Sequence, residues 1–356
     1  MTLRMSMFAS HVSALSSLLN ALNQIDRGRR RWVALVVVAV FLSGCVQSLD
    51  DLGVALHDIP PKLLANMRSK GMKPEGPVLV RIFKMESELE VWKIDGSGKY
   101  ALLKIYPMCR WSGKLGPKTK TGDRQAPEGF YRVSMAGLNP KSQFYLSFNL
   151  GYPNRLETAL GYSGEALMVH GACSSSGCFA LTDQGVGEIY AVVEKALKGG
   201  QPAFQVQAYP FRMTPQNLAA HRDGPNLAFW KNLKEGYDIF EARRREPRVA
   251  ACGRKYVFDA EFKDGDPRDP LAACPERLDQ SDPAVVAKSS ADDRKYQELA
   301  ARSLTPLSYQ DGGMHPSFRA LLKENGDIKL AEKVSVIKYP ISRPAAALAD
   351  PFDGRE

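Results

Sequence analysis

Short runs of β-forming residues alternate with turn residues over much of the chain between residues 77 and 210. Residues 78–83 are rich in β-formers, and residues 88–94 alternate between polar and apolar side chains, as half-buried strands do. Turn residues at 95–98 then lead into a third run at 100–106, so this region predicts a β-hairpin or meander. Further strands are predicted over residues 129–134, 144–150, 166–169 and 204–209.

One helix is predicted after Cys178, where the hydrophobic period changes from that of a strand to that of a helix. Asp183 is expected to cap this helix, and Gly199 and Gly200 are expected to end it. Its apolar face consists of Val186, Ile189, Val192, Val193 and Leu197.

Helical periodicity returns after residue 214, in a segment that ends at the arginine cluster 243–245. Positive charge at the C-terminal end of a helix interacts favourably with the helix dipole. Weaker signals predict a helix at 61–67, a strand at 255–258 and a short helix near 293–301. The pattern as a whole predicts a mainly β fold with flanking helices, in which a β-sandwich-like half is followed by a mixed α/β C-terminal extension.

Residues 27–45 have the features of a targeting signal: four arginines, a short apolar run at 32–42, and then Leu-Ser-Gly-Cys. The apolar run is short for a membrane-spanning helix, and small residues stand where a signal peptidase cuts. The last four residues resemble the lipobox of bacterial lipoproteins, in which Cys45 is lipidated and becomes the new N-terminus. An uncleaved signal anchor is the alternative. Either interpretation predicts an exported protein held through its N-terminus at the periplasmic side of a membrane, and Val46 favours the outer membrane for a lipoprotein.

This organisation predicts five segments along the chain. They are a signal/lipoprotein segment (1–45), a tether (46–76), a catalytic domain (77–210), a flanking helical segment (211–246) and a C-terminal extension whose role the sequence does not indicate (247–356).

The composition is that of a globular protein, with 44% hydrophobic and 24% charged residues in a chain of 356. A formal net charge of +9 points to nucleic acid or anionic lipid as a partner. Residues 1–44 contain five arginines and one aspartate, however, so their removal leaves a net charge of +5. No stripe of Lys and Arg interleaved with aromatic residues remains, and nucleic acid is therefore not an expected partner.

Export permits disulfide bonds, because the periplasm is oxidising. Apart from Cys45, five of the six cysteines remain, so at least one is free or paired with another chain. Cys252 and Cys274 are predicted to pair with each other, and Cys109 is a candidate neighbour of Cys173.

Residues 168–183 hold the densest group of chemically reactive side chains. A predicted strand ends at His170, a loop of small residues follows, and Gly177 and Cys178 lead toward the predicted helix. A cysteine is nucleophilic as the thiolate, which a nearby imidazole or helix N-terminus favours. Cys178 is therefore the predicted nucleophile and His170 its base. The carbonyl of Gly171 is expected to orient the ring, and the N–H groups near Gly177 and Cys178 to stabilise an oxyanion.

Three other interpretations fit the same residues. In the first, Cys173 and Cys178 form a local disulfide. In the second, these two cysteines and His170 ligate zinc, although the sequence offers no further ligand for such a site. His170 can also be a structural histidine at the end of a strand. No metal or organic cofactor is expected.

His170-Gly171 followed by Ser175-Ser176-Gly177-Cys178 resembles the signature of the L,D-transpeptidase (YkuD-like) catalytic domain family. The resemblance covers about residues 77–245 and is similar to the YafK-type murein L,D-transpeptidase branch. It is carried by motifs that occur in the same order, at residues 81–84, 88–92, 106–109, 111–118, 122–131 and 147–154.

The resemblance implies that the protein acts on peptidoglycan stem peptides. Cys178 would attack the carbonyl that joins the L-centre of diaminopimelate to D-alanine, releasing D-alanine and leaving a thioester. An amine of another stem peptide, or of a wall-attached lipoprotein, would then accept the acyl group. The resemblance also places Ser175 and Gly177 in the oxyanion loop. Two alternatives are an amidase of the same fold that hydrolyses the bond between diaminopimelate and a lipoprotein lysine, and a non-catalytic wall-binding lipoprotein.

Two positions depart from the family pattern. Ser176 stands where many members have histidine, and Ala180 where many have arginine, so the group that binds the substrate carboxylate is unassigned. Arg124 or Lys114 is predicted to supply this positive charge, because a cation pairs well with a carboxylate. Ordinary solvation of a loop is the alternative for both residues.

Overall fold

The computed structural model describes residues 58–278, 281–337, 339–342 and 350–352. The predicted signal segment and Cys45 lie outside these ranges. Of the helices within them, none combines the length and the apolar character that a membrane crossing needs.

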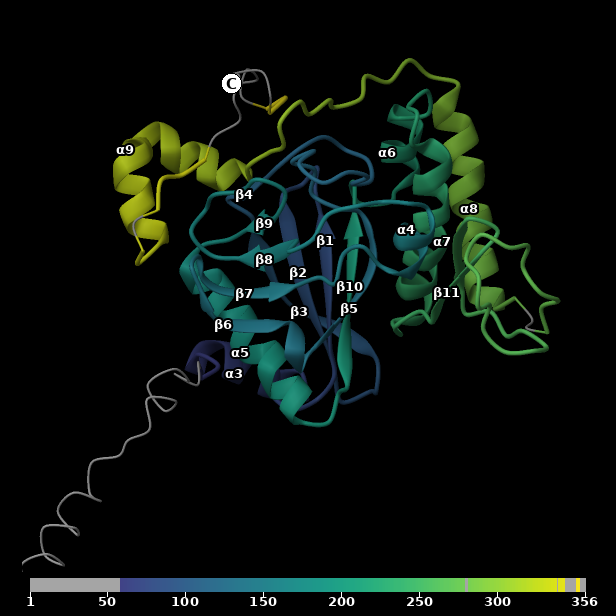
Figure 1. Ribbon diagram of the computed structural model, residues 1–356, viewed down its shortest axis with the longest axis horizontal. Helices are drawn as coiled ribbons and strands as arrows, with labels where there is room; N and C mark the ends of the chain where they lie inside the picture. The colour runs from purple at the N-terminus through teal and green to yellow at the C-terminus, as the bar shows by residue number, and fades with distance from the viewer. Residues whose placement is uncertain (1–57, 279–280, 338, 343–349, 353–356) are drawn as a thin grey trace, which may run out of the picture. The chain divides into compact units, whose positions relative to one another are not determined.

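The first sheet has five strands, in the order β3-β2-β1-β10-β5 (Figure 1). The first three strands of the chain form the predicted antiparallel meander, and β10 then pairs parallel with β1 and antiparallel with β5. All six residues of β1 are buried, as expected for a central strand that is covered on both faces. The strands are β1 (Val78–Phe83), β2 (Glu88–Ile94), β3 (Tyr100–Pro107), β5 (Gly129–Ser134) and β10 (Ala203–Tyr209).

The second sheet also has five strands, in the order β4-β9-β8-β7-β6. The strands β8 and β9 run parallel, and the other pairs are antiparallel. A short 3-10 helix, η3, leads from the first sheet into the second. The elements are β4 (Arg110–Trp111), η3 (Met135–Gly137), β6 (Leu138–Ser142), β7 (Tyr145–Asn149), β8 (Met168–His170) and β9 (Phe179–Ala180).

One apolar cluster joins the two sheets to helix α5 (Asp183–Lys198). Val80 of the first sheet, Phe148 of the second and Ile189 of the helix are all fully buried in it. Each such side chain contributes about 1.5–3 kcal/mol through burial. A third sheet is the antiparallel pair of β11 (Val249–Cys252) and β12 (Lys255–Phe258). These sheets and their flanking helices confirm the predicted fold class.

The cap of α5 differs from the prediction. The N-cap is Thr182, whose Oγ1 accepts a hydrogen bond from the N–H of Gly185 at 3.0 Å. Asp183 is the first helical residue, and its side chain bonds elsewhere. Both residue types are good caps, so only the backbone path decided between them.

Helix α3 (Pro61–Ser69) belongs to the packed domain. Leu63 and Met67 are buried in the main apolar cluster, together with Ile59. The described part of the predicted tether, from Asp58 on, therefore packs against the sheets.

Helix α7 (Leu227–Arg243) packs against the first sheet through a second, aromatic-rich cluster that includes Tyr209 and Tyr237. Arg81 of β1 is buried among these rings and forms an ion pair with Glu241 of α7 at 2.6 Å. Residues 211–246 therefore form a helical layer on this sheet, which also contains α6 (Pro215–Ala220).

The remaining elements are α4 (Arg155–Ala159), β11 (Val249–Cys252), β12 (Lys255–Phe258), α8 (Pro283–Ala300) and α9 (Pro316–Val334). The predicted short helix near 293–301 is the end of α8, which starts at the N-cap Asp282. The sequence prediction missed α4, β11 and α9, and in the second sheet it missed β4, β6 and β9. The four residues of β11 are too few to show a period, and Gly326, with φ 73°, kinks α9.

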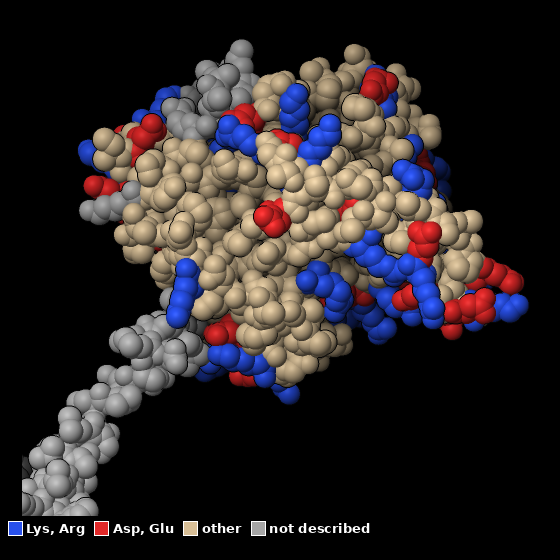
Figure 2. All heavy atoms as spheres, viewed as in Figure 1, with Lys and Arg blue, Asp and Glu red and all other residues tan. Residues whose placement is uncertain are grey.

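Charged side chains of both signs lie intermixed at the right edge of Figure 2, where Figure 1 places α8 and β11. Asp292 of α8 pairs with Lys288 at 2.7 Å and with Lys234 of α7 at 2.8 Å. This edge is therefore a network of ion pairs and carries no patch of a single sign.

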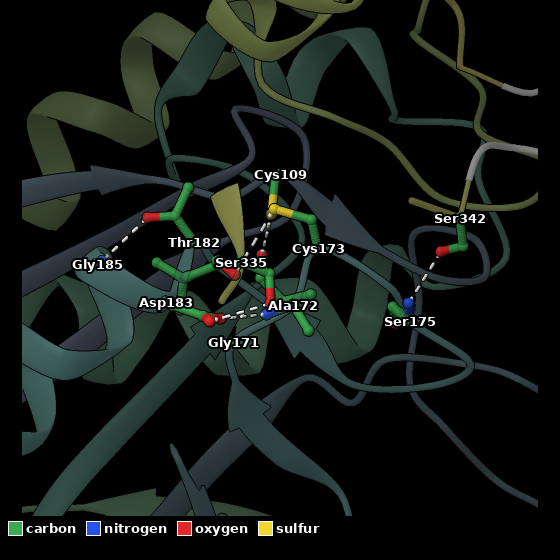
Figure 3. The surroundings of a disulfide bond; sticks show 12 residues. Cys109, Gly171, Ala172, Cys173, Ser175, Thr182, Asp183, Gly185, Ser335 and Ser342 are labelled. Carbon is green, nitrogen blue, oxygen red and sulfur yellow. Dashed lines mark hydrogen bonds between the residues drawn. A yellow bond between two sulfur atoms is a disulfide. The ribbon is translucent and has the colours of Figure 1, made fainter. Parts of the chain in front are cut away.

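Two disulfides are present among the described residues. Cys252 pairs with Cys274, as the sequence favoured, and Cys109 pairs with Cys173 (Figure 3). Cys178 is the free cysteine of the described chain. The alternatives of a Cys173–Cys178 disulfide and of a zinc site that uses Cys173 are therefore wrong, because Cys173 already has a partner.

Candidate active site

The parallel pair β8–β9 places His170 and Cys178 on the same face of the second sheet. Val169 is opposite Phe179 in the register, and both are fully buried in the core. Side chains alternate along a strand, so His170 faces away from that core. Cys178 directly precedes β9 and has the same parity as Ala180, the register partner of His170. The backbone N–H of Met168 donates to Sγ of Cys178 at 3.4 Å, which places the thiol beside β8.

His170 is held in one orientation and one tautomer. Its Nδ1 lies 2.6 Å from the carbonyl oxygen of Gly171, which only accepts hydrogen bonds. The proton of the neutral ring is therefore on Nδ1, and Nε2 has the lone pair that a base needs. The ring packs on Phe144, with 4.8 Å between centroids, and burial lowers the pKa of His170 to about 4.

Gly171 is required at its position because no side chain fits there. A Cβ atom would lie 2.5 Å from Oδ1 of Asp183 and 2.9 Å from the carbonyl oxygen of Phe144. The N–H of Gly171 also donates to that Phe144 oxygen at 3.0 Å. The glycine thus lets the backbone after His170 approach α5 and β7 closely.

The Cys178 thiol is protonated in the unliganded site. Burial raises the pKa of the thiol, while the Met168 N–H and the charge of Lys118 lower it. Since the pKa of His170 is about 4, its imidazole is neutral at neutral pH. At neutral pH the same face of the second sheet therefore holds a protonated thiol and a neutral imidazole.

Ser175 organises the loop that precedes Cys178. Its Oγ accepts from the N–H of Cys178 at 3.1 Å and of Gly177 at 3.4 Å, and it donates to the Cys178 carbonyl at 2.7 Å. Ser112 lies 2.7 Å away from the same Oγ. Gly177 has φ 134°, which only glycine adopts readily. The two N–H groups predicted to form the oxyanion site therefore point at the Ser175 hydroxyl in this state.

A cavity of about 160 Å³ opens beside Cys178. Two of the cations that line it are Lys118 and Arg124. Lys118 is 4% exposed and forms an ion pair with Asp123. Arg124 is 55% exposed and lies 3.8 Å from Asp311. Lys114, the other predicted cation, is not among the lining residues.

Lys118 was missed at the sequence level. It lies in the motif 111–118, but nothing in the sequence separates it from Lys114, four residues earlier. Burial and the neighbouring thiol distinguish it only once the chain is folded. No group of three or more His, Cys, Asp or Glu side chains in the described ranges is arranged to hold a metal ion.

The C-terminal extension reaches this site, which the sequence did not indicate. The Oγ of Ser342 accepts from the N–H of Ser175 at 2.9 Å (Figure 3). The Tyr339 ring packs edge-on against Phe144, which in turn contacts His170. Ser342 and Tyr339 therefore contact the loop before Cys178 and the ring that packs on His170.

No protein-family model matches the chain. It is 41% identical over 227 residues to "Putative L,D-transpeptidase YafK" of Escherichia coli strain K12, and equally to the protein of that name from strain O157:H7. Each alignment covers 64% of this chain and 90% of the relative.

Among solved structures, the helical cell shape determining protein Pgp2 of Campylobacter jejuni is 14% identical, with a TM-score of 0.32. The match covers 71% of this chain and 84% of Pgp2. Bd1075 of Bdellovibrio bacteriovorus is also 14% identical, with a TM-score of 0.27. That match covers 49% of this chain and 74% of Bd1075. The assignment therefore depends on the sequence identity to the two relatives: the chain belongs to the L,D-transpeptidase family, in the branch of YafK.

Proposed function

We propose that the protein is a cysteine-dependent murein L,D-transpeptidase that forms a thioester with peptidoglycan stem peptides at Cys178. The observation that carries this proposal is the shared face of β8 and β9, which holds both the free cysteine Cys178 and His170, whose Nε2 is unprotonated. Membership of the YafK branch supports the substrate class.

The reaction begins with transfer of the Cys178 proton to Nε2 of His170 as sulfur attacks the carbonyl carbon between the diaminopimelate L-centre and D-alanine. The tetrahedral adduct collapses, the C–N bond breaks, and the imidazolium returns the proton to the departing D-alanine amine. An acceptor amine then attacks the thioester, loses its proton to His170, and releases the thiolate, which is reprotonated. Electrons and protons balance without a cofactor.

Two groups are suited to assist this reaction. Displacement of the Ser175 hydroxyl from the N–H groups of Gly177 and Cys178 would free both donors for the oxyanion. Lys118, beside the thiol and in the same cavity, is suited to bind a substrate carboxylate, with Arg124 at the cavity rim.

The boundaries of the five predicted segments stay predictions. In this proposal residues 77–210 supply the catalytic pair, and Tyr339 and Ser342 of the C-terminal extension contribute to its surroundings. Export, lipidation at Cys45 and attachment to the outer membrane remain predictions, since that cysteine is outside the described residues.

The test uses the full-length chain with two substrates, diaminopimelate-type muropeptides and lipoprotein-linked muropeptides, and analyses the products by mass spectrometry. Cysteine-dependent formation of dimers with loss of D-alanine supports the transpeptidase. Release of the lipoprotein stub that depends on Cys178 identifies the amidase alternative. Equal product formation by wild type and Cys178→Ala would refute a thioester mechanism, and no product from either substrate would favour the wall-binding module.

A further inference from the structure

A single peptide group connects His170 to a buried carboxylate. The carbonyl oxygen of Gly171 accepts from Nδ1 of His170 at 2.6 Å. The N–H of that same peptide, contributed by Ala172, donates to Oδ1 of Asp183 at 2.9 Å. Because a peptide group is planar and rigid, the position of the carboxylate determines the position of the carbonyl that holds the imidazole.

Asp183 is itself held on its other side by the C-terminal extension. Its Oδ2 accepts from Oγ of Ser335 at 3.0 Å and from the N–H of Val336 at 2.7 Å. Figure 3 shows the Asp183 carboxylate beside Ala172 and Ser335. The side chain is 5% exposed, and its position in the first turn of α5 suits a negative charge. With three donors from two distant segments, the carboxylate is fixed in one rotamer.

The backbone that Asp183 holds is in a strained conformation. Ala172 has φ 66° and Cys173 has φ 42°, a region that residues other than glycine adopt at a cost of about 1–3 kcal/mol each. The Ala172–Asp183 hydrogen bond and the Cys109–Cys173 disulfide both restrain this stretch. Strain of this kind persists only where the surrounding contacts impose it.

We propose that Asp183 is a positioning residue for His170, acting through the Gly171–Ala172 peptide, and that Ser335 and Val336 hold its carboxylate in place. This inference rests on the proposed function, in which His170 is the base of Cys178. A carboxylate bonded to the N–H of a peptide draws electron density toward the carbonyl oxygen and strengthens the hydrogen bond at that end. The imidazolium that forms during proton transfer is thereby stabilised, as by the aspartate of a Ser-His-Asp triad, with one peptide group interposed.

The experiment measures the alkylation rate of Cys178 by iodoacetamide in the full-length protein, at pH 7 and at pH 10. Mass spectrometry of the Cys178 peptide excludes any contribution from Cys45. The variants are Asp183→Asn, His170→Ala and Ser335→Ala. Asp282→Asn is the matched control, because Asp282 is also a carboxylate at a helix N-terminus and asparagine caps equally well.

We expect Asp183→Asn to slow alkylation about tenfold at pH 7, the effect of losing one hydrogen bond to a charged group. At pH 10 hydroxide is abundant enough to remove the thiol proton in place of His170, so the rate should approach that of wild type. For the enzymatic reaction, kcat should fall by a similar factor while KM changes little. Ser335→Ala, which leaves the Val336 N–H in place, should slow alkylation about two- to threefold at pH 7, and Asp282→Asn should match wild type.

Three results would overturn the inference. If His170→Ala is slow but Asp183→Asn and Ser335→Ala match wild type, Asp183 has no positioning role and the proposed function stands. If Asp183→Asn is equally slow at both pH values, the substitution has changed access to the thiol and not its proton transfer. If His170→Ala also matches wild type at pH 7, the catalytic pair and the proposed function fail together. If the Asp183→Asn variant does not fold, the alkylation rate of Ser335→Ala is compared with those of wild type and His170→Ala in the same way.

Discussion

The Cys109–Cys173 disulfide offers a test of how the loop after His170 is held. Cys173 follows His170 by three residues, and both half-cystines are at most 1% exposed. The bond spans 64 residues of sequence, for which loop-closure entropy gives a stabilisation of about 4 kcal/mol. The Cys252–Cys274 bond spans 22 residues, which corresponds to about 3 kcal/mol, and it lies beside a separate apolar cluster around the β11–β12 hairpin.

Two double variants separate stability from site geometry. Cys109→Ala/Cys173→Ala should lose about 4 kcal/mol of unfolding free energy and also most of the Cys178 reactivity, because the strained residues Ala172 and Cys173 lose a restraint. Cys252→Ala/Cys274→Ala should lose about 3 kcal/mol and retain full reactivity. Alanine is chosen so that no hydroxyl is buried at these sites.

The assay is urea unfolding of the full-length protein, followed by circular dichroism, with iodoacetamide labelling of Cys178 measured under native conditions. Similar losses of reactivity in both variants would show that general destabilisation, and not the loop, controls the thiol. Unchanged reactivity in Cys109→Ala/Cys173→Ala would refute the reasoning that the disulfide restrains the site.

Three further outcomes are expected. The pKa of His170 is about 4, and protonation removes the base, so kcat/KM should fall only as the pH drops toward 4. A fall of kcat/KM centred near pH 6.5, the ordinary pKa of histidine, would contradict the buried neutral ring. Gly171→Ala should cost about 1–3 kcal/mol in urea unfolding and most of the activity, whereas Gly96→Ala, with no atom closer than 3.9 Å to the new Cβ, should be tolerated. Lys118→Gln should raise KM for stem peptides about tenfold, and Lys114→Gln should leave KM unchanged. Equal KM values for the two variants would show that Lys118 is not the carboxylate-binding group.

The sequence alone was sufficient for the parts of the molecule whose signals are local. Alternation over residues 88–94 and turn residues at 95–98 predicted the β1–β3 meander, and the helical period after Cys178 predicted α5. The predicted nucleophile, base and ring-orienting carbonyl all lie within nine residues, from His170 to Cys178. A short strand, a loop and a second strand place such residues close together in any fold that pairs the two strands in parallel.

Tertiary structure decided every feature that depends on distant residues. The sequence predicts that Asp183 caps a helix, yet its carboxylate accepts hydrogen bonds from Ala172 and from Ser335, which is 152 residues away. The sequence offered Cys109 only as a candidate neighbour of Cys173, and the bond forms because β4 lies beside β9, a strand pairing that no local pattern encodes. Ser342 reaches Ser175 across 167 residues. Propensity and periodicity describe a residue's own element, whereas these contacts arise only when separate elements pack, so they were accessible only from the folded chain.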